Sequence, residues 1–255
     1  MENGFRKDRQ PYMTTDKENQ LTDYSRSRRE FLKGVALAGT GTLAARPGAA
    51  RTPPDPQPQS VSKESPAMRV LMPIGDATEV MDTLYPFFRL PEEGIQVVVA
   101  GPEVRQYHGV LHEIPPDVTI PWDITREQPA YHIKAEVAFR EVDPAGCAGL
   151  FLSGGRAPEY LRYDKDLLRI ARHFAEARKP VAVVCHGIEI AAVAGMLKGR
   201  KATTVPKCAL DITSFGGSYI DQPYVVDGNI VSCRTWHDYG TSFMKEFIRM
   251  LKSAA

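Results

Sequence analysis

From Met68 onward, short runs of wholly apolar residues alternate with segments whose apolar residues recur at helical spacing. Strands are expected at 68–74, 95–100, 149–152 and 180–184 and in two arms within 224–233, and helices at 78–91, 165–178, 187–197 and 239–251. Strands without a polar face that alternate with helices are typical of a parallel sheet covered on both sides. The pattern therefore predicts a single α/β domain with a mainly parallel sheet, in which chemistry gathers at the carboxyl ends of the strands.

Residues 102–147 interrupt this alternation. They carry Pro115, Pro116, Pro121, Pro129 and Pro144, and proline is a poor fit to helix interiors and central strands. We expect a loop-rich segment with a β-excursion on the rim of the sheet.

The N-terminal part has the layout of an export signal. Arg28 and Arg29 precede a modestly apolar stretch at 31–45, and small residues follow at Ala49 and Ala50. The sequence SRREFLK around the two arginines resembles a twin-arginine signal, which predicts export to the periplasm. We expect a tail and signal peptide over 1–50, a Pro/Ser-rich linker over 51–66 and the folded domain over 67–255; a disordered basic N-terminus is the alternative.

Composition narrows the classes of partner. Lys and Arg number 32 against 31 Asp and Glu, so net charge gives no support for binding nucleic acid or anionic membranes. No apolar run in the body of the chain is long enough to span a membrane, and no stable membrane anchor is expected. Four cysteines in 255 residues do not indicate a disulfide scaffold.

The most informative short stretch is VVCHG, residues 183–187, at the end of an expected buried strand. A sharp strand-to-helix turn would lift the Cys185 side chain out of the sheet. The helix start offers backbone N–H groups that favour a thiolate and can hold an oxyanion. Gly187 permits a close turn, as in a nucleophile elbow. The alternative is that Cys185 fills space in the core, as most buried cysteines do.

Five segments carry a resemblance to the ThiJ/PfpI family, which extends from about Met68 to Leu251. They are MPIGDATEVMDTLYPFFRLPEEG (72–94), GGRAPEYLR (154–162), KPVAVVCHG (179–187), AAVAGMLKGRKAT (191–203) and VVDGNIVSCR (225–234). The resemblance implies a flavodoxin-like three-layer sandwich of the class I glutamine-amidotransferase type. The family is associated with cysteine-peptidase, glyoxalase and protein-deglycase activities and with stress-chaperone behaviour.

The same resemblance assigns site residues. Cys185 matches the nucleophile and His186 its adjacent histidine. Glu159 matches an acidic residue that reaches the Cys-His pair of a neighbouring subunit, which implies a homo-oligomer. Such a carboxylate would favour the imidazolium form of His186. Gly155 matches a backbone N–H position facing the thiol, and we expect it to border the substrate together with Gly154 and Gly187.

The first helix should also bring a carboxyl group to the thiol. Counting back from Pro86, the usual family glutamate falls on Asp82, and Glu79 lies one turn earlier on the same face. Either residue can contact the sulfur. The chain departs from the family at Ile188 and Glu189 after Cys-His-Gly, and at Ser153, which puts the substrate in doubt.

No metal or cofactor is expected. His108 and His112 have a helix-like spacing, but Gly109 and the nearby prolines argue against a helix there. His132 and His237 have no paired ligand motif. The sequence contains no phosphate-binding glycine motif, and we expect Trp236-His237-Asp238 to be surface packing that could sit near the pocket rim.

The function we expect is that of a hydrolase or lyase whose cysteine attacks a carbonyl carbon of a small carbonyl compound or a protein substrate. The peptidase, glyoxalase and deglycase types stay open. The alternatives are a non-catalytic periplasmic stress chaperone or thiol redox sensor of the same fold, and a module that only binds a small ligand.

Overall fold

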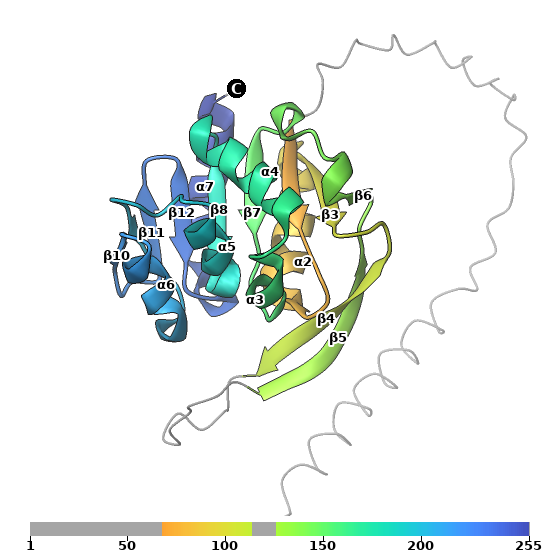
Figure 1. The fold of residues 1–255 in the computed structure, drawn as a ribbon, viewed down its shortest axis with the longest axis horizontal. Coiled ribbons are helices and arrows are strands. Elements are labelled where there is room, and N and C mark those ends of the chain that lie inside the picture. Colours follow the sequence, from red (N-terminus) through yellow and green to blue (C-terminus); the bar gives the residue numbers. More distant parts are fainter. Residues whose placement is uncertain (1–67, 114–125, 255) are drawn as a thin grey trace, which may run out of the picture. The chain divides into compact units, whose positions relative to one another are not determined.

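The computed structural model describes residues 68–113 and 126–254, so the expected signal peptide and linker lie outside the described residues. A seven-stranded sheet forms the centre of the domain (Figure 1). Its strands in spatial order are β11 (Tyr224–Asp227), β12 (Ile230–Cys233), β8 (Val181–Val184), β7 (Gly149–Leu152), β1 (Arg69–Pro73), β3 (Gln96–Gly101) and β6 (Val137–Ala138). Neighbouring strands are parallel except β11 and β12, which confirms the mainly parallel sheet.

Helices cover both faces of this sheet, because successive strand residues point into two separate cores. In β8, Val181 and Val183 enter one core and Ala182 and Val184 the other. The helices are α2 (Val80–Arg89), α3 (Ala157–Leu161), α4 (Lys165–Glu176), α5 (Ile188–Val193), α6 (Ala209–Ser214) and α7 (Phe243–Ala254). The first core takes its helical side chains from α3, α4, α5 and α6, and the second contains α7 with apolar residues of α2 packed against it. The three-layer sandwich is confirmed.

Two expected helix starts are wrong by a few residues. The helix expected from 78 begins at Val80, because Thr78–Glu79 forms the short strand β2 and the Glu79 side chain caps the helix by accepting from the N–H of Asp82. The helix expected from 239 begins at Phe243, after a 3-10 turn at Trp236–Gly240. Both segments that replace the expected helix starts contribute residues to the site, namely Glu79 from β2 and Trp236 and His237 from the 3-10 turn.

The expected rim excursion is a long antiparallel hairpin of β4 (Gln106–Glu113) and β5 (Arg126–Lys134), which extends away from the sandwich (Figure 1). β2 pairs with β4 and ties the hairpin to the start of α2. A bulge lies between His108 and Val110, where a side chain at Gly109 would sit 2.6 Å from the Tyr131 carbonyl oxygen. The hairpin thereby brings His112 next to the site.

Two further short strands, β9 (Lys201–Ala202) and β10 (Ser218–Tyr219), pair in parallel beside α6. Among residues 68–113 and 126–254, no helix is both long and apolar enough to cross a lipid bilayer.

Candidate active site at the carboxyl edge of the sheet

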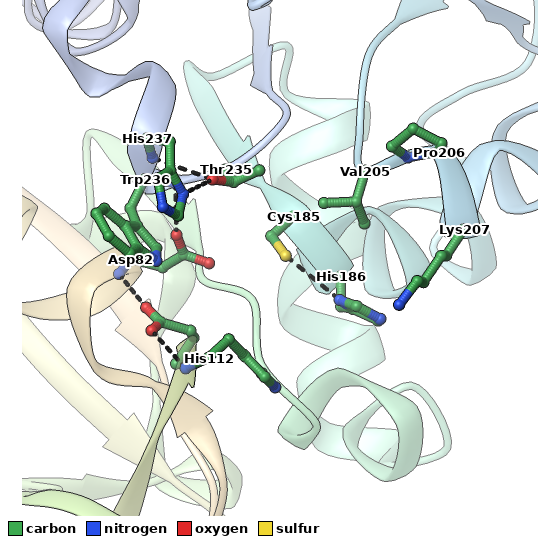
Figure 2. Close-up of a pocket in the computed structure, with 11 residues that line it drawn as sticks. Asp82, His112, Cys185, His186, Val205, Pro206, Lys207, Thr235, Trp236 and His237 are labelled. Carbon is green, nitrogen blue, oxygen red and sulfur yellow. Dashed lines mark hydrogen bonds between the residues drawn. The ribbon is translucent and has the colours of Figure 1, made fainter. Parts of the chain in front are cut away.

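A cavity of about 390 Å³ opens beyond the carboxyl end of β8. Figure 2 shows side chains from several separate segments converging on it. Its lining consists of Glu79, Asp82, His112, Cys185, His186, Val205, Pro206, Lys207, Thr235, Trp236 and His237. The edge of the sheet predicted to carry chemistry therefore does hold a concave site.

Cys185 lies on a strained turn between β8 and α5. Its φ of 54° is a left-handed conformation that residues with a side chain rarely adopt. One hydrogen bond holds the turn, in which Thr204 donates from Oγ1 to the Cys185 carbonyl oxygen at 2.8 Å. The turn also needs glycine at 187, because a side chain there would lie 2.4 Å from the Leu152 carbonyl oxygen. The residue is 8% exposed and lines the cavity, as the nucleophile-elbow prediction requires.

His186 presents its ring to the thiol. Nδ1 lies 3.3 Å from Sγ of Cys185 (Figure 2). Burial, together with the positive charges of His112, Arg156 and Lys207, lowers the pKa of His186 to about 4. Within one chain this shift favours an uncharged ring that can accept a proton at neutral pH, and the imidazolium that Glu159 of a neighbouring subunit would favour stays a prediction.

The pKa of the Cys185 thiol shifts in the direction that opposes the predicted thiolate. Burial raises the pKa of the Cys185 thiol well above its ordinary value, and the Asp82 carboxyl adds to this effect. The backbone N–H groups of His186 and Gly155 act in the opposite direction, as predicted, but they are outweighed. Both pKa shifts favour a neutral thiol beside a neutral imidazole.

Both predicted carboxyl residues line the cavity, and they have different environments. Glu79 is 1% exposed; its carboxylate accepts from the N–H groups of Asp82 at 2.6 Å and His112 at 3.4 Å, and burial raises its pKa to about 7. Asp82 is fully buried, and burial together with Glu79 raises its pKa well above the ordinary value. Oδ1 accepts from the Trp236 N–H at 3.1 Å, whereas Oδ2 has no hydrogen-bond partner among the described residues. Of the two, Asp82 is the carboxyl that influences the thiol.

The predicted glycines let neighbouring backbone and side chains come closer than any residue with a side chain would allow. A side chain at Gly154 would lie 2.4 Å from Oδ2 of Asp82 and 2.5 Å from Cβ of Cys185, so only glycine lets the two approach here. Gly155 has a φ of 88°, and a side chain there would lie 2.3 Å from the Glu79 nitrogen. Gly154, Gly155 and Gly187 are not among the described residues that line the cavity, and their predicted contact with substrate stays a prediction.

Glu159 lies outside the cavity of its own chain. It occupies the first turn of α3, its side chain is 40% exposed, and Oε1 pairs with Nε of Arg156 at 2.8 Å. Arg156 also contacts Glu127, which reaches His112 at 3.4 Å. Glu159 thus ends a charged network that runs along the rim from His112.

Several lining residues escaped sequence reasoning. The Trp236 and His237 rings stack with centroids 3.5 Å apart on one wall, so these two residues are not mere surface packing. Lys207 and His186 point toward one another across another wall (Figure 2). A place near the pocket rim was among the expectations for Trp236 and His237, whereas the position of His112 depends on the pairing register of the hairpin, which the sequence does not give.

The remaining cysteines agree with the expectation that the chain is not a disulfide scaffold. Cys147, Cys208 and Cys233 are buried, and the four cysteines, all within the described part of the chain, are free thiols.

The site has a cysteine on a strand-to-helix turn, a histidine next to it and buried carboxyl groups nearby. In a parallel α/β sandwich, these features indicate a protein whose chemistry depends on the cysteine. The chain belongs to the DJ-1/PfpI family, whose sequence profile matches residues 68–250. A deglycase of Pyrococcus abyssi is 36% identical over 185 residues, covering 72% of this chain and 100% of the relative. The deglycase PfpI of Pyrococcus furiosus is 36% identical over 188 residues with the same coverage. A ThiJ/PfpI domain protein of Brachyspira murdochii matches in structure with a TM-score of 0.58 at 18% identity, covering 73% of this chain and 96% of that one, and so shows the fold alone.

Proposed function

We propose that the protein is a deglycase- or glyoxalase-type enzyme in which Cys185 attacks the carbonyl carbon of a small reactive carbonyl compound or of its adduct with an amine. The observation that carries the proposal is the contact between Sγ of Cys185 and Nδ1 of His186 at the mouth of a cavity. The names of the archaeal relatives, which match 72% of this chain, support the same class of chemistry.

The first step transfers one proton and forms one bond. The thiol proton of Cys185 moves to the neutral His186 while sulfur bonds to the carbonyl carbon, and the oxygen becomes an oxyanion. The N–H groups of His186 and Gly155 face the sulfur and can stabilise that charge. Coupling attack to proton transfer removes the need for a preformed thiolate, which burial disfavours.

For an α-oxoaldehyde, the resulting hemithioacetal must become a thioester. A base removes the proton from the former aldehyde carbon and returns a proton to the neighbouring carbon, so no external oxidant or reductant takes part. Glu79 lines the cavity and has a pKa of about 7, which suits a group that takes and returns a proton near neutral pH. Water then hydrolyses the thioester to a hydroxy acid and regenerates the thiol. From a hemiaminal adduct, sulfur bonds to the carbon that carries the amine as the C–N bond breaks, and the amine leaves with the thiol proton that His186 took up, which gives the same hemithioacetal.

The test compares turnover of methylglyoxal, and of its adduct with acetyl-lysine, by the wild-type protein and by Cys185→Ala. Cys147→Ala is the matched control, because that thiol is also buried but lies outside the cavity. We expect hydroxy-acid formation that Cys185→Ala abolishes and Cys147→Ala retains. Equal rates in all three proteins would refute the proposal. Cleavage of casein that depends on Cys185, without action on the carbonyl substrates, would replace it with a peptidase.

The proposal extends to location: the protein acts outside the cytoplasm after export through the twin-arginine route. Arg28 and Arg29 within SRREFLK support it. Replacing both arginines by lysine should leave the protein in the cytoplasmic fraction of a bacterial host, whereas wild-type protein should reach the periplasm. Equal distribution of the two proteins would contradict export by this route.

A further inference from the structure

A second cluster of reactive side chains lies behind the catalytic histidine. One ring nitrogen of His186, a carboxylate oxygen of Glu189 and the sulfur of Cys208 all lie within 4.8 Å of one another. The three residues come from the turn after β8, from the first turn of α5 and from the 3-10 turn before α6. Glu189 and Cys208 are buried, and His186 connects them to the cavity.

We propose that His186, Glu189 and Cys208 bind a zinc ion, which withdraws His186 from Cys185. Imidazole, carboxylate and thiolate are the three side-chain ligands that zinc uses, and three protein ligands leave a fourth position open. The site itself does not depend on the proposed function; only the loss of activity that zinc causes rests on it.

The distance between the Cys208 sulfur and a Glu189 carboxylate oxygen fits a tetrahedral ion. Ordinary zinc–sulfur and zinc–oxygen bonds at a tetrahedral angle place the two ligand atoms about 3.6 Å apart. Sγ of Cys208 lies 3.8 Å from Oε1 of Glu189, so binding needs little movement of either side chain. The orientation of Glu189 is fixed from behind, because Nη1 of Arg162 holds its other oxygen, Oε2, at 3.2 Å.

The charges around the cluster also suit a divalent cation. Arg162 is shared between Glu189 and Asp211, which it contacts at 2.9 Å, so two carboxylates face a single guanidinium. When zinc binds, Cys208 releases its proton to solvent, and the thiolate adds a second uncompensated negative charge. These two charges attract the ion against the positive charge of Lys207, which also acts on His186.

Binding of the ion would occupy an imidazole nitrogen and fix the ring. His186 could then no longer take the proton of Cys185, and attack on the carbonyl carbon would stop. We had expected no metal site because no pair of histidines has ligand spacing; this cluster instead combines ligands 3 and 22 residues away from His186, counted along the chain.

The experiment uses the full chain with Co²⁺ as a spectroscopic substitute for Zn²⁺. Wild-type protein should show the near-ultraviolet sulfur-to-cobalt charge-transfer band and bind one Zn²⁺ per chain in equilibrium dialysis. Cys208→Ala should lose the band and weaken zinc binding by more than the about 10–100-fold that loss of an outer-shell partner costs. Cys233→Ala, a buried thiol outside the cluster, should behave as wild type.

Cys185→Ala separates the two sites. The band should persist in this variant, because Cys185 is not a ligand of the proposed ion. A band that vanishes in Cys185→Ala and remains in Cys208→Ala would overturn the proposal, as would zinc binding equal in Cys208→Ala and wild type. Glu189→Gln gives a second test that keeps all the thiols, and its zinc affinity should also fall. If the metal-free enzyme shows no turnover although the cobalt band is present, the proposed function fails and the zinc site stands.

Discussion

Sγ of Cys185 lies 3.3 Å from Nδ1 of His186, the next residue in the chain. Consecutive side chains rarely meet in extended structure, where they point to opposite faces. The contact is possible because Cys185 has a φ of 54° and the chain enters a 3-10 turn directly after β8. Backbone strain at one residue therefore creates the proton-transfer pair of the site.

The hydrogen bond from Thr204 supports this strained residue. Thr204→Val keeps the side-chain shape and leaves the buried Cys185 carbonyl oxygen without the Oγ1 donor at 2.8 Å. We expect a loss of about 1–3 kcal/mol in unfolding free energy and a lower kcat, because the elbow can relax. Denaturant unfolding and steady-state kinetics measure the two effects. Unchanged stability and kcat would show that Thr204 does not hold the elbow.

Gly154→Ala tests whether close approach of Asp82 and Cys185 is needed. The added methyl group would lie 2.4 Å from Oδ2 of Asp82 and 2.5 Å from Cβ of Cys185. We expect about 1–3 kcal/mol of destabilisation and a marked fall in kcat, because the two side chains must separate. The control is Gly240→Ala, where an added methyl group meets nothing within 4 Å. Wild-type kinetics for Gly154→Ala would contradict the role given to this contact.

Glu79 makes stability depend on pH. Its pKa is raised to about 7 in the folded protein from an ordinary 4.5, so the native state binds the proton more tightly than the unfolded chain does. This contribution is complete below about 4.5 and is lost as pH rises to about 7; its size is roughly 3 kcal/mol. His186 acts in the opposite sense, since its lowered pKa costs stability as pH falls below its ordinary value of 6.5.

The difference between wild type and Glu79→Gln isolates the carboxyl contribution from that of the histidine. We expect the variant to gain stability relative to wild type as pH rises through this window, measured by urea unfolding at a series of pH values. A stability difference that does not change with pH would mean that Glu79 is not a raised-pKa acid.

Glu159 tests the predicted oligomer. If it reaches the Cys-His pair of a neighbouring subunit, Glu159→Gln should lower kcat by about a hundredfold, the lower end of a general acid–base contribution, without changing the melting temperature. Light scattering should also find a homo-oligomer. Glu141→Gln is the control, an exposed acid that likewise pairs with an arginine. A monomer with unaffected kcat in Glu159→Gln would remove Glu159 from the site.

The sequence alone predicted the features that depend on a local pattern of residues. Apolar runs located β1, β3, β7 and β8, and the CHG motif at the end of β8 located the elbow. It could not supply the sign of the pKa shifts, because these come from the burial of Cys185 and His186 and from charges distant in sequence, such as those of Asp82 and Lys207. The roles of His112 and Trp236 depended likewise on hairpin register and on a backbone contact to Asp82.

The central claim is that a neutral Cys185 thiol gives its proton to a neutral His186 during attack on a carbonyl carbon. The most direct measurement is the rate of iodoacetamide alkylation of Cys185 as a function of pH, followed by mass spectrometry of its peptide. Because alkylation requires the thiolate, we predict that the rate stays low at neutral pH and rises only above the ordinary thiol pKa of 9.0. A rate that already reaches its plateau near neutral pH would show a preformed thiolate and contradict the account.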